Sequence, residues 1–127
     1  MSDQPLSLQD RHDLIEMVLN VFRHWGVPSP AHPVLLGLPQ NTSARALLKI
    51  QQGSPIPNET ELVARAELIL KIYRGVQTLF PGNASMANYW VSTDSYQFNH
   101  RSPLEVMYDE GIEGMRAVLN HINGDVW

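Results

Sequence analysis

The chain has 127 residues, of which 43% are hydrophobic and 17% charged, and its formal net charge is −4. This composition is typical of a globular protein and excludes a disordered chain, and the absence of cysteine excludes disulfides, thiolate catalysis and cysteine-bound zinc. No apolar run approaches the roughly 20 residues that a membrane span requires. Because Met1-Ser2-Asp3-Gln4-Pro5 lacks the basic and apolar regions of a signal peptide, we expect a cytoplasmic protein.

The first predicted helix begins after Ser7 and ends at Gly26, where Pro28 enforces the stop. Ser7 is the expected N-cap, since its hydroxyl can accept a hydrogen bond from a free amide of the first turn. The apolar residues of this helix recur at helical spacing and include Leu14, Val18, Val21, Phe22 and Trp25. The stripe is broad, so we expect the helix to pack against at least two others.

Two short helices are predicted next, one from Ser29-Pro30 to Gly37 and one over residues 43–52, capped by Asn41 or Thr42. A short helix, a glycine-containing turn and a second helix outline a helix-turn-helix, whose second helix presents its N-terminal residues to DNA bases. The candidate DNA contacts are Thr42, Ser43, Arg45 and Lys49, with Gln51 further along. The alternative is a solvated polar face, with Ala44, Leu47, Leu48 and Ile50 on the buried side.

The longest predicted helix is capped by Asn58, runs for about 21 residues and ends at Pro81-Gly82-Asn83. Its apolar stripe is wide, which indicates a central helix that is buried on most sides. Gly75 lies inside this helix, where it costs up to about 1 kcal/mol relative to alanine. We therefore expect another helix to cross closely at Gly75.

A helix start is predicted at Ser102, because Ser102 is a candidate N-cap, Pro103 occupies the first helical position and Glu105 completes a capping box. This helix should stop at Gly111, and a second one should run from Ile112 to Asn123-Gly124. Among the aromatic residues and methionines of this region, Trp90, Met107 and Met115 are expected in the core. Tyr96, Phe98 and Trp127 are instead candidates for an aromatic interface patch.

Charge is divided unevenly along the chain. Residues 1–83 carry seven basic and seven acidic residues, whereas residues 84–127 carry two basic and six acidic residues. The C-terminal part is therefore unsuited to a phosphate backbone and better suited to a protein partner. The candidate recognition helix has only two exposed bases, fewer than a dedicated DNA-binding protein usually shows.

The C-terminal part contains an ordered set of motifs: Trp90-Val91, a polar connector with Phe98, Arg101-Ser102-Pro103-Leu104, the turn Glu110-Gly111, a final amphipathic helix and the closing Gly124-Asp125-Val126-Trp127. This set resembles the toxin-binding domain of antitoxins of the Xre/MbcA/ParS type. The resemblance implies that this segment covers and inhibits a RES-domain toxin, an enzyme that consumes NAD. It implies toxin contacts at Trp90, Phe98, Arg101, Ser102, Pro103 and Leu104, and at Gly124, Asp125, Val126 and Trp127 near the toxin's active-site cleft.

The preceding part is similar to the degenerate Xre-like helix-turn-helix and long helix of the same family, so the resemblance covers residues 14–127. The matching positions are Leu35-Leu36-Gly37, Thr42 and Arg45, Gly53, Arg65, Ile72-Tyr73 and Leu79-Phe80. Family members commonly have an aromatic residue where this chain has Ala46 and Leu47. The expected fold is all-α: an Xre-like helix-turn-helix bundle (1–57), a long connecting helix (58–83) and a small helical toxin-binding domain (84–127).

No pattern of catalytic residues stands out. The five histidines lack a metal-ligand spacing, and Asp109, Glu110 and Glu113 are interpreted as an exposed acidic turn. We expect an antitoxin and not an enzyme, without cofactor or metal. Its expected partners are a RES-domain toxin, operator DNA for repression of its own operon, and further copies of the chain. The alternative is a stand-alone helix-turn-helix transcriptional regulator whose C-terminal part is a dimerisation module.

Overall fold

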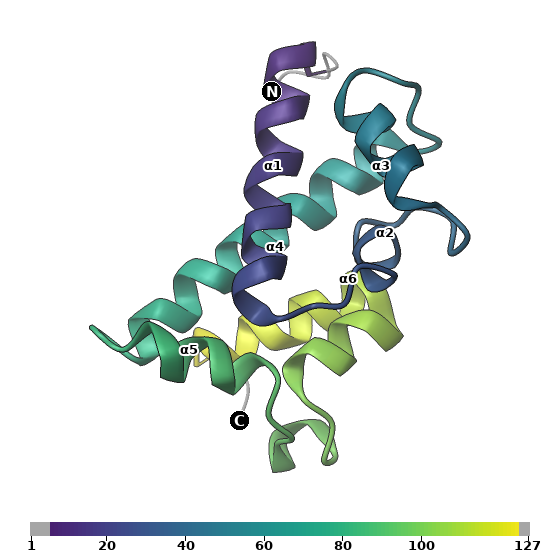
Figure 1. The fold of residues 1–127 in the computed structure, drawn as a ribbon. Coiled ribbons are helices and arrows are strands. Elements are labelled where there is room, and N and C mark those ends of the chain that lie inside the picture. The colour runs from purple at the N-terminus through teal and green to yellow at the C-terminus, as the bar shows by residue number, and fades with distance from the viewer. Residues whose placement is uncertain (1–5, 125–127) are drawn as a thin grey trace.

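The computed structural model describes residues 6–124, and within this range the protein is all-α (Figure 1). Its elements are α1 (Leu8–Trp25), α2 (Ala31–Leu35), α3 (Ala44–Gln51), α4 (Glu59–Leu79), α5 (Ala84–Val91), the 3-10 helix η1 (Tyr96–Phe98) and α6 (Pro103–Ile122). No helix in this range is both long enough and apolar enough to span a membrane.

Three helices begin at the caps that the sequence predicts. The Ser7 hydroxyl accepts a hydrogen bond from the amide of Asp10 at 3.0 Å, and the Asn58 carboxamide oxygen accepts one from Glu61 at 3.1 Å. At the start of α6, Ser102 and Glu105 form the full reciprocal capping box. These bonds satisfy amides that have no partner inside the helix, which fixes where each helix starts.

The start of α3 differs from the prediction, because its N-cap is Ser43 and not Asn41 or Thr42. The Ser43 hydroxyl accepts a hydrogen bond from the amide of Ala46 at 3.0 Å. Arg11 of α1 fixes the other end of α3 by donating to the carbonyl oxygens of Ile50, at 3.3 Å, and Ser54, at 2.7 Å. The start of α2 also lies later than predicted, at Ala31.

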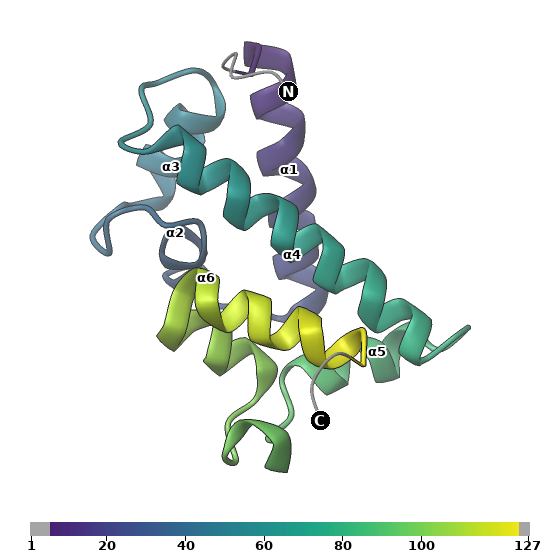
Figure 2. The ribbon, with the colours of Figure 1, turned by 180° about the vertical axis from the view of Figure 1, so that it is seen from behind.

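The central position of α4 is confirmed. Figure 2 shows α4 lying between α1 and α6, and it packs against α5 as well. The predicted close crossing at Gly75 is also present: a Cβ atom placed there would lie 2.7 Å from Cγ2 of Ile122 in α6. Only glycine allows α6 to lie this near to α4 at that position.

The chain turns sharply at Gly111 within α6, as predicted. Gly111 has φ 63° and ψ −136°, which a residue with a side chain rarely adopts. Two segments of α6 result, and they meet at Gly114, where an added Cβ would lie 2.3 Å from the carbonyl oxygen of Val106.

Two elements, α5 and η1, are not predicted from the sequence. Asn83 caps α5 through a hydrogen bond from the amide of Met86 to its side chain at 3.1 Å. Only Ala87 and Val91 of this helix are buried, so its sequence pattern is weak. A helix this short gains its stability from packing on its neighbours, which a local pattern does not reveal.

Buried side chains from all six α-helices and from η1 join in one hydrophobic core, with Phe22, Leu47, Ile69, Val91 and Met115 among them. Arg65 of α4 adds a polar connection through this core. Its guanidinium pairs with Glu61 at 2.9 Å and donates to the carbonyl oxygen of Val34 at 3.4 Å. The α2–α3 region and α6 are therefore held against the same central helix.

Candidate protein-binding surface

The segment between α5 and α6, residues 92–101, forms a closed loop around η1 that we call the η1 loop. It projects from the helical body between α5 and α6 (Figures 1 and 2). An isolated antiparallel bridge closes it, in which the Ser95 amide donates to the Arg101 carbonyl oxygen at 3.1 Å. The His100 amide donates back to the Ser95 carbonyl oxygen at 2.9 Å.

Phe98 and Tyr96 lie on opposite sides of the η1 loop. The prediction that Phe98 belongs to an exposed patch is wrong, because Phe98 is buried and its ring packs edge-on against His121 at 5.3 Å. Tyr96 is 86% exposed and contacts the ring of His100 at 4.7 Å. One aromatic residue therefore anchors the loop to the core and the other points into solvent.

Arg101 closes the C-terminal side of the η1 loop and forms ion pairs with two carboxylates of α6. Its guanidinium lies 2.5 Å from Oε2 of Glu110 and 3.5 Å from Oδ2 of Asp109. The hydrogen bond to Glu110, followed by the effects of Asp109, raises the pKa of Arg101 above its ordinary value. Arg101 is thus committed to contacts inside its own chain.

The next three candidate contacts, Ser102, Pro103 and Leu104, form the first turn of α6. Ser102 and Pro103 are buried and Leu104 is half-buried, so the first two support the helix and do not offer a contact surface. Glu105 is exposed, and its carboxylate accepts a hydrogen bond from the Ser102 amide at 2.9 Å. This bond lowers the pKa of Glu105, so the side chain is charged at neutral pH.

Trp90 and Gly124 complete the candidates that the structure describes. Trp90 is half-buried and stacks on His121 with ring centroids 6.2 Å apart and an interplanar angle of 6°. Gly124 is exposed. Asp125, Val126 and Trp127, together with the prediction that they enter a toxin cleft, lie outside the described residues.

Met107 and Met115 are buried, as predicted.

The acidic character of the C-terminal part is concentrated near the η1 loop. Asp94 lies in the loop, and Glu105, Asp109 and Glu110 lie on the first segment of α6, where all four residues are exposed. Both bases of residues 84–127 are already paired, Arg101 with Asp109 and Glu110, and Arg116 with Glu113 at 2.7 Å. The surface around the loop is consequently negative.

The candidate DNA contacts fall into two groups. Arg45 and Lys49 are exposed on α3 and form no ion pair within residues 6–124. Thr42 is half-buried, and Ser43 is exposed but uses its hydroxyl as the N-cap. The connection between α2 and α3 covers residues 36–43, longer than the three- or four-residue turn of a helix-turn-helix. The helix-turn-helix interpretation stays a prediction.

Three side chains of α3 lie differently from the predicted arrangement. Gln51 is 4% exposed and donates to Oε1 of Glu16 in α1 at 2.9 Å, so it is not available to DNA. Leu48, expected on the buried side, is 52% exposed. Ala44 is exposed as well. These differences follow from how α3 packs on α1, because the neighbouring helix decides which face of a short helix is buried.

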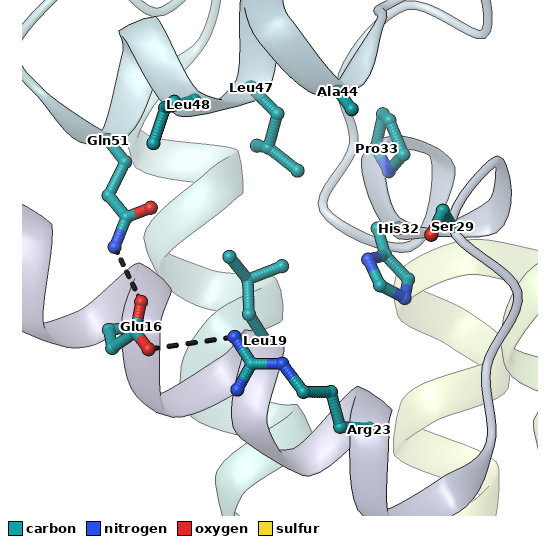
Figure 3. A pocket seen from close by; sticks show the side chains of 10 residues that line it. All are labelled: Glu16, Leu19, Arg23, Ser29, His32, Pro33, Ala44, Leu47, Leu48 and Gln51. Atoms are coloured by element: carbon teal, nitrogen blue, oxygen red, sulfur yellow. Dashed lines mark hydrogen bonds and ion pairs between the residues drawn. The ribbon is translucent and has the colours of Figure 1, made fainter.

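Leu48 borders a groove of about 290 Å³ between α1, α2 and α3 (Figure 3). Its apolar part includes Leu19, Pro33 and Leu47, and Glu16 and Arg23 lie at its polar end, 3.6 Å apart. The hydrogen bond from Gln51, followed by the charge of Arg23, lowers the pKa of Glu16. No local sequence signal predicts this groove, since it depends on the separation of α2 and α3. Within residues 6–124, no group of three His, Asp or Glu residues could hold a metal ion.

Neither a scan against protein-family models nor a search of curated proteins found a match for the chain.

Proposed function

We propose that this protein is an antitoxin that binds and sterically inhibits a RES-type, NAD-degrading toxin through residues 84–127. The resemblance of Trp90-Val91, Arg101-Ser102-Pro103-Leu104 and the closing residues to such antitoxins motivates the proposal. The observation that carries it is the exposed acidic surface around the η1 loop. With Arg101 and Arg116 paired internally, this surface disfavours nucleic acid and favours a basic protein surface.

The proposed inhibition is steric, and this chain performs no chemical step. The helical body holds the η1 loop and α6 in place, and the partner's cleft is covered when this surface docks. Stable protein–protein interfaces bury about 1,200–2,000 Å² in total. The loop alone is too small for such an interface, so we assign the exposed faces of α5 and α6 to it as well.

A co-expression experiment tests this function. We expect the adjacent reading frame to encode a RES-domain protein, and we expect the two proteins to co-purify and the toxin to lose its effect on growth. Deletion of residues 125–127 combined with Arg101→Ala should weaken both results. Arg101→Lys keeps the charge and serves as the control. Full neutralisation by the combined variant would contradict the detailed mechanism.

The second proposed activity is repression of the protein's own operon through α3. The supporting observation is that Arg45 and Lys49 are exposed and unpaired within the described part of the chain. A gel-shift with the upstream DNA at physiological salt should show binding that the Arg45→Ala/Lys49→Ala variant loses. Removing two phosphate contacts should reduce the slope of log affinity against log salt by about 2. Equal binding by the variant would rule out α3.

The same gel-shift separates the antitoxin from a stand-alone transcriptional regulator. Sequence-specific DNA binding by the pure chain, together with no binding to any RES-domain protein, would favour the regulator. Under that alternative, residues 84–127 would act as a dimerisation module. Size-exclusion chromatography with light scattering then measures how many copies of the intact chain associate.

A further inference from the structure

We infer that Tyr96 is the anchor residue through which this protein engages its partner, and that the partner offers a pocket for a phenol ring rimmed by lysine or arginine. The inference rests on the proposed function, because it specifies the chemistry of the toxin surface that the C-terminal part contacts. Four features of the η1 loop carry it: the exposure of Tyr96, the rigidity of the loop, the position of His100 and the surrounding charge.

The first feature is the exposure of the Tyr96 side chain. Tyr96 is 86% exposed, compared with 63% for Tyr89 on α5 and 40% for Tyr108 on α6. Tyrosine is enriched among the residues that dominate binding energy, because it buries a large rigid ring and still has a polar end. The η1 loop, which carries Tyr96, projects from the helical body (Figure 1).

The second feature is the rigidity of the loop that presents Tyr96. Each backbone amide from Gln97 to Arg101 donates a hydrogen bond to an acceptor inside the loop. Phe98 anchors the loop to the core, and Arg101 ties it to α6 through Glu110. A loop that is already ordered loses little conformational entropy on binding, so more of the contact energy appears as affinity.

The third feature is His100, which lies in the left-handed region with φ 66°. Asn99 precedes it with φ 57°. This conformation is uncommon for residues other than glycine, although asparagine tolerates it. The His100 ring contacts the Tyr96 ring edge-on, with an interplanar angle of 64°. We assign His100 as the positioning residue that holds the phenol ring in its outward orientation, which gives this backbone strain a role.

The fourth feature is the charge around Tyr96. Four carboxylates, those of Asp94, Glu105, Asp109 and Glu110, surround the base of the loop against one guanidinium, that of Arg101. A partner pocket with acidic edges would be repelled by this arrangement. A pocket rimmed by lysine or arginine would be attracted, which accelerates association at low salt.

The test measures the affinity of the full chain for the purified RES-domain toxin by titration calorimetry. Loss of a hot-spot residue costs at least 2 kcal/mol, so Tyr96→Ala should weaken binding by at least about 30-fold. Tyr96→Phe keeps the ring and should remain within about 5-fold of the wild type. Tyr89→Ala and Tyr108→Ala are the matched controls and should change affinity by less than Tyr96→Ala. Circular dichroism confirms that each variant is folded.

A second pair of variants distinguishes a role of His100 in positioning Tyr96 from a role in folding. His100→Gly removes the ring that contacts Tyr96 but suits the left-handed backbone, so we expect unchanged thermal stability and about 2- to 12-fold weaker binding. Asn99→Gly makes the same backbone change without touching Tyr96, and its affinity should equal that of the wild type. Equal affinities for both variants would refute the role of His100.

The outcomes distinguish this inference from the proposed function. If the wild type binds the toxin and Tyr96→Ala binds equally well, the anchor is wrong while the antitoxin function stands. If all three tyrosine variants weaken binding equally, Tyr96 has no special role and the inference is also wrong. If the wild type does not bind the toxin at all, both fail. If the rate of association does not fall as the salt concentration rises, the proposed rim of lysine or arginine around the partner's pocket is wrong.

Discussion

Arg65 contacts two regions that lie far apart in the sequence, α2 and the turn at Gly111 within α6. Its side chain is 16% exposed, pairs with Glu61 and donates to the carbonyl oxygen of Val34 in α2. A Cβ at Gly111 would lie 3.0 Å from its guanidinium, so the turn of α6 packs directly on it. Glycine at position 111 is therefore required by both the backbone conformation and the space that Arg65 occupies.

Replacing Arg65 with methionine should destabilise the protein by about 1.5–3 kcal/mol, because hydrogen bonds to a charged group are lost and Glu61 is left unpaired. Urea unfolding followed by circular dichroism measures this change in the free energy of unfolding. Arg116→Met is the matched control, since Arg116 pairs with Glu113 on the surface. Exposed pairs contribute little, and the control should lose less than about 1 kcal/mol. Equal losses would mean that Arg65 has no special structural role.

Glu105 should make stability depend on pH. Its pKa is lowered in the folded chain by the hydrogen bond from the Ser102 amide. The ionised carboxylate therefore stabilises the folded state fully above its ordinary pKa of about 4.3, and this contribution is lost as pH falls through the lowered value. We expect Glu105→Gln to have a lower melting temperature than wild type at neutral pH, and the two curves to converge in acid. Parallel curves down to pH 2 would contradict this.

Sequence patterns predict some features of single side chains, such as helix caps, but not others, such as burial. The capping residues Ser7, Asn58 and Ser102 were predictable, because a cap acts on amides two or three positions away. The burial of Phe98 was not predictable, since it depends on His121 from the end of α6. The burial of Gln51 likewise depends on Glu16 of α1. Contacts between residues far apart in sequence leave no local periodic signal.

At the scale of the elements, the crossing of α4 and α6 is fixed by Gly75. Alanine at an exposed helical position would add up to about 1 kcal/mol of stability relative to glycine. At Gly75, the added methyl group would lie 2.7 Å from Cγ2 of Ile122, a branch at the Cβ atom that has little freedom to move. We expect Gly75→Ala to destabilise the protein by about 1–3 kcal/mol instead.

A double-mutant cycle identifies the cause of that loss. Ile122→Ala removes the obstructing methyl group, so the effect of Gly75→Ala should shrink or reverse in that background, with a coupling energy of about 0.5–3 kcal/mol. Chemical denaturation of the four proteins gives the coupling. Additive effects would mean that the two helices are not held together at this point. Gly114→Ala offers no such rescue, because the obstruction there is the backbone carbonyl of Val106.

The elements that the sequence predicted well are the long ones with strong caps. α4 and the two segments of α6 have wide apolar stripes and matching start signals, and Gly111 marks the turn between them. α5 has only eight residues and two buried side chains, and η1 has three residues. These two elements exist because the surrounding helices complete their packing. Tyr96 and Phe98 both lie on η1, so a prediction that missed this element could not tell the exposed ring from the buried one.

On the scale of the whole molecule, one continuous core joins the candidate DNA-binding region to the candidate protein-binding surface. α4 packs against α1, α5 and α6, and α2 also contacts α6. The η1 loop and α3 are therefore attached to the same hydrophobic core within residues 6–124. A change in the packing of α6 would be transmitted to α2 through Arg65, since both contact this side chain.

This continuous core predicts that the chain unfolds in one cooperative transition. Trp25 in α1 and Trp90 in α5 report on its two ends. One variant retains only Trp25, through Trp90→Phe and Trp127→Phe, and the other retains only Trp90, through Trp25→Phe and Trp127→Phe. Within each variant, the fluorescence and circular dichroism transitions in urea should coincide, as expected for a two-state domain. Because the two signals are compared within one variant, a loss of stability caused by the substitutions shifts both transitions equally. If Trp90 fluorescence changes at a lower urea concentration than the helical signal, residues 84–127 unfold separately. The contacts of Arg65 then do not make the two ends of the core unfold together.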